Sequence, residues 1–195
     1  MNGEEKNKLK SCFYLFNHKI DSVSVFLDQS KWVIDDYLQH ISEDRKDPKF
    51  KEMYAFNFDE EYYSSLSFLP NFLYQSIILL LFSLFIENLK KVLIILGASN
   101  EEVGLCYKKG CEYLKLLEKF KELGFELNLS KKDEVFLDLM SKLRNEIIHK
   151  SYGEDNVSKL KLLTLEECKL YVTCYKKILE SLEKTLLEKD NSFLN

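Results

Sequence analysis

Glycine and proline are scarce in this sequence. Its 195 residues include six glycines and two prolines, the residue types that most often mark turns. An all-β sandwich or barrel needs many turns, so this shortage argues against such a fold and favours long helices. The length suits one domain with a substantial core. We therefore expect a single all-α domain over residues 1–189 and a frayed tail over residues 190–195.

The sequence also lacks a strong excess of charge of either sign. Its formal net charge is −4, so no overall basic field attracts nucleic acid, and an RNA partner would need a local basic patch. Arginine is rare as well, since only Arg45 and Arg144 among the 28 basic residues are arginines. Where lysine supplies almost every positive charge, an arginine suggests that planar, bidentate contacts are required.

The cysteines form no metal-binding or disulfide pattern. They are Cys12, Cys106, Cys111, Cys168 and Cys174. Their number is odd, and their spacing lacks a CxxC pair with a partnering histidine, which argues against a zinc site and a disulfide framework. We expect reduced thiols, no metal and no cofactor. The polar N-terminal segment has no apolar core of the kind found in export signals, so we expect a cytoplasmic protein.

One long apolar run stands out, at residues 72–86 (FLYQSIILLLFSLFI). A membrane-spanning helix needs about 20 apolar residues, and this run meets Glu87 first. We interpret the run as a buried central helix over about 71–96, with no membrane partner. Pro70 is expected to open this helix, and Gly97 is expected to close it.

The N-terminal region predicts a long amphipathic helix. Apolar residues recur every three or four positions from Leu9 through Tyr37 to Ile41, the pattern of one apolar stripe on a helix. No glycine or proline falls between Glu4 and Asp47. A helix of this length would extend beyond a compact bundle unless it bends or a second protomer covers part of it. This is one reason to expect a homodimer.

Capping boxes mark three further helix starts: Ser99 to Glu102, Ser130 to Asp133 and Thr164 to Glu167. In such a box, the side chains of a Ser or Thr and of an acidic residue three positions later each bond the other's backbone N–H. Gly124 and Gly153 are the expected stop signals. The sequence thus predicts a bundle of five or six helices and no strand. Beyond the two helices above, the predicted helices cover about 58–67, 100–123, 132–152 and 164–189.

The helix over about 132–152 carries the one pattern that suggests chemistry, Arg144-Asn145-Glu146-Ile147-Ile148-His149. Asn145 and His149 are four residues apart and share a face, whereas Arg144 projects about 140° away from His149 around the helix axis. His149 belongs to the last turn, where the helix dipole favours a cation. Arginine and histidine near one helix end, with an asparagine beside them, could bind a phosphodiester. The core face is expected to be complete without these three residues; it comprises Phe136, Leu139, Met140, Leu143 and Ile147.

This hexapeptide resembles the motif of the HEPN superfamily, in which four to six residues separate an arginine from a histidine and a polar residue often follows the arginine directly. Arg144, Asn145 and His149 occupy those three places. The resemblance implies a helical bundle that dimerises along the motif-bearing face. It further implies a metal-independent endoribonuclease in a toxin–antitoxin or phage-defence system, with a possible antitoxin or regulatory protein as partner. Arg144, Asn145 and His149 would then be the catalytic residues.

A narrow polar stripe on the apolar helix agrees with this resemblance. Ser76, Ser83, Glu87 and Lys90 fall within about 60° of one another around that helix. Members of the family often carry a serine or glutamate on a preceding helix, facing the motif. By this resemblance, Ser83, Glu87 and Lys90 would line the substrate cleft opposite Arg144.

The mechanism implied by the resemblance needs no metal. The RNA's own 2′-OH attacks the adjacent phosphate, which leaves a 2′,3′-cyclic phosphate and should not be stopped by EDTA. His149 would act as base or acid, because histidine ordinarily titrates near neutrality. Arg144 would hold the phosphate oxygens and stabilise the transition state, and Asn145 would orient the phosphate or the imidazole. A two-fold dimer that joins two motifs would supply both base and acid.

Two classes of function remain open at this point. The first is the endoribonuclease, and the second is a non-catalytic HEPN-like module that binds RNA, a nucleotide or a partner protein. The net acidity supports the second class. In that case His149 and Arg144 form a solvated helix end, and Glu87 pairs structurally with Lys91 or Lys90.

Overall fold

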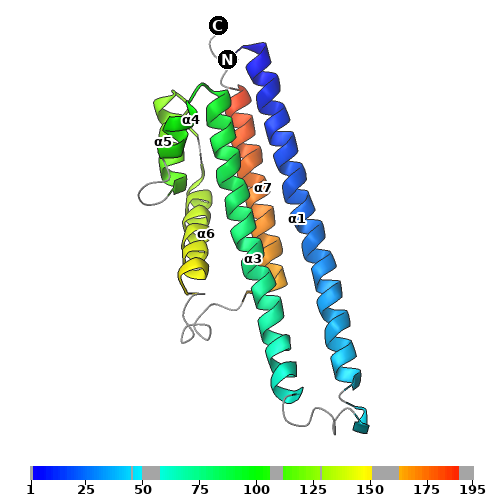
Figure 1. Ribbon diagram of the computed structural model, residues 1–195. Coiled ribbons are helices and arrows are strands. Elements are labelled where there is room, and N and C mark those ends of the chain that lie inside the picture. The colour runs from blue at the N-terminus through cyan, green and yellow to red at the C-terminus, as the bar shows by residue number, and fades with distance from the viewer. Residues whose placement is uncertain are drawn as a thin grey trace.

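The computed structural model describes residues 2–44, 46–49, 58–105, 112–127, 129–150 and 163–188, with the backbone alone for 58–69, 105 and 150. These residues form six α-helices and no strand (Figure 1). The predicted all-α bundle with a long N-terminal helix is therefore confirmed. The helices are α1 (Gly3–Asp44), α3 (Phe58–Ile95), α4 (Asn100–Leu105), α5 (Glu112–Glu122), α6 (Lys131–Lys150) and α7 (Leu165–Glu188).

Helix α3 is the centre of the bundle. It contacts every other helix, with α1 on one side and α5 and α6 on the other (Figure 1). Its side chains Ile78, Leu81, Phe85 and Leu93 are fully buried, which confirms that the apolar run is a buried central helix. Within the described ranges, no helix has the length and apolar character needed to cross a membrane.

The break predicted at Pro70 is wrong. Helix α3 runs from Phe58 to Ile95 with Pro70 inside it, so the short helix predicted over 58–67 is the first part of α3. A proline removes one backbone hydrogen bond but fixes φ at a helical value, and the bonds on either side keep the helix continuous. The predicted end is confirmed, since Gly97 has φ +101°, the left-handed conformation typical of helix C-termini.

The three capping boxes form as predicted. In each box, a side-chain oxygen of either residue accepts a hydrogen bond from the backbone N–H of the other, over 2.8–3.3 Å. The pairs are Ser99 with Glu102, Ser130 with Asp133, and Thr164 with Glu167. Of the helix predicted over 100–123, the structure describes two parts, α4 and α5. Gly104 weakens helix propensity at the end of α4, and residues 106–111 lie outside the described residues.

Helix α1 has 42 residues and rises about 63 Å. Its predicted apolar stripe is buried from Leu9 to Ile34, but Tyr37 is exposed, contrary to the prediction. The reason is the extent of α7, which pairs with α1 through Asp21–Lys176 and Asp28–Lys169. Because Lys169 lies in the first turns of α7, the part of α1 beyond Asp28 extends past that helix (Figure 1).

Helix α6 is rotated slightly from the predicted orientation. Met140 and Ile147 are buried as predicted, but Leu139 is exposed, and Leu137 is fully buried in its place. Apolar residues recur with helical spacing on two adjacent faces of α6. The sequence alone therefore does not show which of these two faces is buried. The rotation matters because Arg144 follows Leu137 by two turns and therefore shares its inward face.

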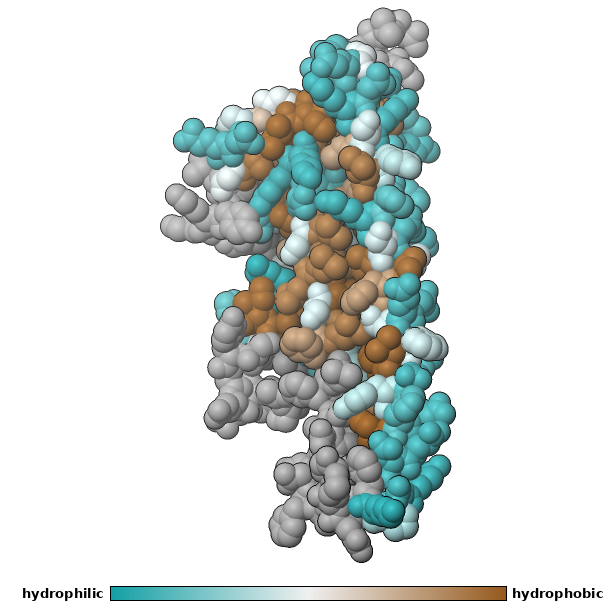
Figure 2. Space-filling view, turned by 45° about the vertical axis from the view of Figure 1, so that its right-hand side comes forward, coloured by the Kyte–Doolittle hydropathy of each residue, from teal (hydrophilic) through white to brown (hydrophobic). Residues whose placement is uncertain are grey.

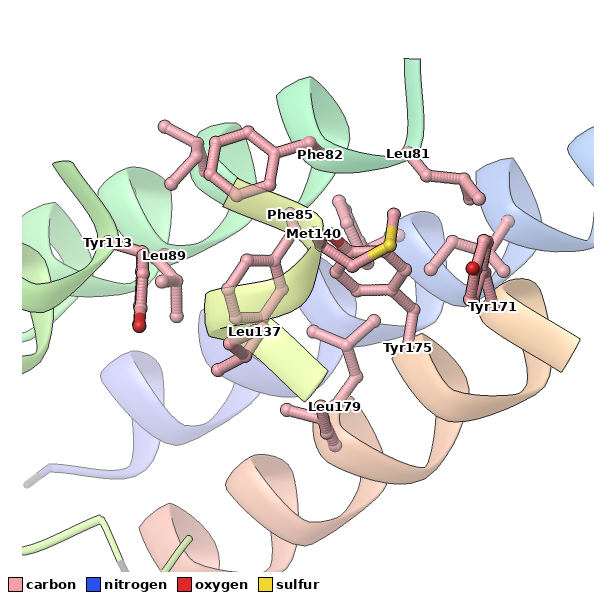
Figure 3. Close-up of a cluster of buried hydrophobic side chains, with 14 of the residues drawn as sticks. Leu81, Phe82, Phe85, Leu89, Tyr113, Leu137, Met140, Tyr171, Tyr175 and Leu179 are labelled. Atoms are coloured by element: carbon pink, nitrogen blue, oxygen red, sulfur yellow. The ribbon is translucent and has the colours of Figure 1, made fainter. Parts of the chain in front are cut away.

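Aromatic rings join three helices at the centre of the core. The ring of Tyr175 on α7 lies 5.3 Å from that of Phe85 on α3 and 5.2 Å from that of Phe136 on α6, measured between ring centroids. Figure 3 shows Tyr175 among Phe85, Met140 and neighbouring leucines. The Tyr175 hydroxyl is buried and has no hydrogen-bond partner among the described residues, so it is desolvated without compensation.

Replacing Tyr175 with phenylalanine is therefore expected to stabilise the fold. Removing an unpartnered buried hydroxyl should raise the free energy of unfolding by about 1 kcal/mol and the Tm by about 2–4 °C for a chain of this size. Differential scanning calorimetry measures both quantities. Tyr14→Phe, at an exposed position of α1, is the control and should change neither. A Tm lowered by Tyr175→Phe would show that the hydroxyl is hydrogen-bonded after all.

Apolar side chains also reach the surface. On the face shown in Figure 2 they gather over the middle of the molecule, beside a hydrophilic region along the right edge. The exposed large apolar residues of α1 and α3 include Leu15, Phe26, Val33, Phe72 and Leu80. Contiguous exposed apolar surface of this kind marks places where proteins meet partners.

Candidate functional site

Arg144 lies at a pocket between α6 and the central helix. The pocket has a volume of about 190 Å³ and a lining drawn from three helices: Phe82, Ser83, Ile86, Glu87 and Lys90 of α3, Glu112 of α5, and Arg144 of α6. The three α3 residues expected opposite Arg144, namely Ser83, Glu87 and Lys90, are thus on this lining. The inward rotation of α6 carries the half-buried guanidinium towards them.

Asn145 is the hydrogen-bond partner of Arg144. The Nη1 group of Arg144 donates to Oδ1 of Asn145 over 2.9 Å. Asn145 itself is exposed and is not part of the pocket lining. A guanidinium carries five N–H donors, so this bond leaves most of them available to a phosphate or carboxylate oxygen.

His149 occupies a different face of α6. Its side chain is exposed, and the pocket lining among the described residues does not include it. This agrees with the angle of about 140° between positions five residues apart on a helix. The structure therefore brings Arg144 together with Asn145 and with the α3 residues, while His149 of the same chain lies outside that group.

His149 is instead the last residue of a row of side chains on the outer face of α6, which we call the outward stripe. Positions 135, 139, 142, 146 and 149 are spaced by four and three residues and so share one face. Val135 and Leu139 in this stripe are exposed apolar residues, at 64% and 43%. Lys142, also in this stripe, forms an ion pair of 2.6 Å with Asp138. The motif-bearing helix thus presents an apolar and partly charged surface that continues to His149.

Three ion pairs involve the acids of the pocket. Lys90 donates to Glu112 over 2.5 Å, and both side chains are largely buried. Glu87 accepts from Lys91 over 2.6 Å and lies 3.6 Å from Lys19 of α1. The hydrogen bond from Lys91 is the main reason that the pKa of Glu87 lies below its usual value. The structural pairing of Glu87 with Lys91, one of the alternatives from the sequence, is present.

Sequence reasoning missed Glu112 and Lys19. Glu112 begins α5, where an acid suits the helix dipole, but nothing in the sequence indicates that it reaches Lys90. The pocket lining itself carries two basic residues, Arg144 and Lys90, and two acids, Glu87 and Glu112; Glu87 is at the same time paired with Lys91 and Lys19, which lie outside that lining. This pocket therefore offers one guanidinium, bonded to Asn145, and no cluster of basic side chains on its lining.

Other chemistry is not evident in the described part of the chain. No group of three or more His, Cys, Asp or Glu side chains there is arranged to hold a metal ion. Cys12, Cys168 and Cys174 are free thiols, and the other two cysteines lie outside the described residues. Burial raises the pKa of Cys168 to about 12, so this thiol is protonated and unreactive at neutral pH.

The fold and the pocket define an all-α helical protein with a single guanidinium at an interhelical site. Comparison of the chain with family models, with curated proteins and with solved structures finds no match. The functional assignment therefore depends on residues 144–149 and the side chains around them.

Proposed function

We propose that this chain is a metal-independent endoribonuclease of the HEPN type, which acts on RNA as a dimer and serves as a cytoplasmic toxin or phage-defence effector. The observation that carries the proposal is the position of Arg144. One of two arginines in the chain, it lines a pocket with Ser83, Glu87 and Lys90 and is held by Asn145.

The chemistry assigned to these residues is RNA self-cleavage. The 2′-OH attacks the adjacent phosphorus, the 5′-oxygen of the next nucleotide leaves, and a 2′,3′-cyclic phosphate remains. Arg144 binds the non-bridging oxygens and stabilises the charge that builds up in the transition state. His149 removes the proton from the 2′-OH or gives one to the leaving oxygen. Asn145 holds the guanidinium in orientation.

The position of His149 supports a composite site. One chain supplies a single imidazole outside the Arg144 pocket, whereas the reaction uses both a base and an acid. A two-fold dimer through the outward stripe of α6 would cover Val135 and Leu139 and bring two copies of His149 to one interface; Arg144, about 140° away around α6, would have to extend its long side chain to reach the same phosphate. An antitoxin or another regulatory protein could block the enzyme by covering the same stripe.

Cleavage of RNA in EDTA tests the proposal. Purified protein is incubated with total RNA and with tRNA, and the fragment ends are analysed. We expect fragments ending in 2′,3′-cyclic phosphate at undiminished rate when divalent metals are chelated. Cleavage that disappears in EDTA would contradict the metal-independent mechanism, and fragments with 3′-hydroxyl ends would contradict attack by the 2′-OH.

The balanced charge of the pocket favours one second candidate, a non-catalytic HEPN-like module. A site in which Glu87 and Glu112 offset Lys90 and Arg144 suits a ligand with little net charge better than a long polyanion. Such a module would bind RNA, a nucleotide or a partner protein without cleaving it, and of these three ligands the balanced charge suits a partner protein best. Labelled RNA that stays intact after incubation with the protein, whether or not a filter retains it, would support this candidate over the endoribonuclease.

A further inference from the structure

A second pocket lies on the other side of Glu87, between α1 and α3. Its volume is about 140 Å³, and its lining includes Cys12, Lys19, Asn88 and Lys91. Glu87 borders this pocket as well as the Arg144 pocket. The two pockets are therefore separated by one side chain of α3.

Asn88 is an anomaly at this position. It is a polar residue on the most apolar helix and is only 1% exposed. Its Oδ1 accepts a hydrogen bond from the Cys12 thiol over 3.3 Å, but its Nδ2 has no partner among the described residues. Buried polar groups are almost always hydrogen-bonded, and exceptions often have a functional reason. Asn88 lines the pocket, and although its Nδ2 is enclosed, a rotation of the amide would present this unused donor to an incoming acceptor oxygen.

The charges around Asn88 favour an anionic oxygen. Lys19 and Lys91 both line the pocket, and Glu87 is the carboxylate that faces them, at 3.6 Å and 2.6 Å. Two ammonium groups against one carboxylate leave a formal excess of one positive charge. A ligand with one negative charge would balance this excess and bond the free donor of Asn88 at the same time.

An apolar groove continues from this pocket along α1 and α3. The groove has a volume of about 560 Å³ and shares Cys12, Leu15 and Lys91 with the smaller pocket. Ile94 and Ile95 line it further along α3, and the α1 side of the groove adds the ion pair of Glu4 and Lys8 together with Asn7 and Ser11. Its size falls within the range of small-molecule sites. A single ligand can therefore place a charged group at Asn88 and an apolar chain along the groove.

We propose that these joined pockets bind a small amphiphilic carboxylate of the fatty-acid class. The carboxylate accepts from Asn88 Nδ2, Lys19 and Lys91, and the hydrocarbon chain packs on Leu15 and Ile94. This site does not depend on the proposed RNA cleavage, because it uses none of Arg144, Asn145 or His149.

Isothermal titration calorimetry with sodium octanoate tests the site, with acetate and octanol as matched ligands that carry only the head or only the chain. Octanoate is expected to bind, and the other two ligands to bind at least about tenfold more weakly, because each loses one part of the contact. Asn88→Leu and Lys91→Met should each weaken octanoate binding by about tenfold. Lys184→Met, on the exposed face of α7, is the control and should leave affinity unchanged.

Stability measurements separate loss of the site from loss of the fold. Asn88→Leu removes an unpartnered buried donor but also the acceptor of the Cys12 thiol, so its melting temperature should stay close to that of the wild type while octanoate affinity falls. Three results would overturn the proposal: no octanoate binding to the wild type, equal affinity for octanol and octanoate, or octanoate affinity unchanged in both Asn88→Leu and Lys91→Met. If Asn88→Leu unfolds, the Lys91→Met result decides.

Discussion

Replacing His149 with alanine is expected to lower the rate of RNA cleavage by about 10²–10⁴-fold, the usual contribution of a positioned general acid or base. His149 is the histidine of the motif and lies outside the Arg144 pocket of its own chain; in general, an imidazole is the side chain best suited to acid–base catalysis. Since His149 is exposed, its removal leaves no cavity and should not change the melting temperature. Initial rates on a labelled tRNA in EDTA measure the effect.

A matched histidine provides the control. His40 is exposed on α1, where its Nδ1 bonds the backbone carbonyl of Asp36; this bond is the main reason that its pKa is raised. His40→Ala should cleave RNA at the wild-type rate. Equal cleavage by wild type and His149→Ala would remove His149 from the mechanism.

Mixed dimers test whether two chains share the site. If catalysis needs His149 from both protomers, refolding wild type with an equal amount of His149→Ala should leave about one quarter of the dimers active. Chains that act independently would retain about one half of the activity instead. Light scattering at micromolar concentration checks the dimer itself, and a monomer there would count against the composite site.

The second large effect is expected at Arg144. Arg144→Ala should lower cleavage by about 10²–10³-fold, the loss seen when one donor to a developing oxyanion is removed. Arg144→Lys keeps the charge but loses the planar fork that contacts two oxygens, so we expect it to recover only a small part of the activity. Lys177→Ala, on an exposed position of α7, is the charge control.

A structural role for Arg144 would give a different result. Because the guanidinium is half-buried, each variant is compared with wild type by thermal melting before its rate is measured. If Arg144→Lys and Arg144→Ala melt as the wild type does and cleave RNA equally fast, Arg144 is not catalytic. If KM for RNA rises while kcat is unchanged, Arg144 binds substrate without stabilising the transition state.

Local sequence signals predicted most of the fold. The capping boxes at Ser99, Ser130 and Thr164 form because each bond connects groups only three residues apart, so tertiary contacts have little influence on them. The break predicted at Pro70 is wrong because the sequence shows only the local cost of a proline within a helix. It does not show the packing that keeps α3 continuous. Leu139 was misplaced because a rotation of α6 by one position depends on which helices surround it.

The candidate site was predicted in part for the same reason. Helical periodicity alone placed Ser83, Glu87 and Lys90 on one stripe, and the structure sets that stripe along the Arg144 pocket. The ion pair between Lys90 and Glu112 joins different helices, so no local pattern indicates it. The unpartnered donor of Asn88 likewise appears only when α1 is packed against α3.

Glu87 borders both pockets, so a ligand that changes its ion pairs in one pocket would alter binding in the other. An anion that draws Lys19 and Lys91 away from Glu87 leaves that carboxylate free beside Arg144, where it competes with phosphate for the guanidinium. Such coupling is reciprocal: if the first ligand changes the affinity for the second by some factor, the second changes the affinity for the first by the same factor. A single carboxylate on the central helix would then act as the coupling element between a metabolite and an RNA.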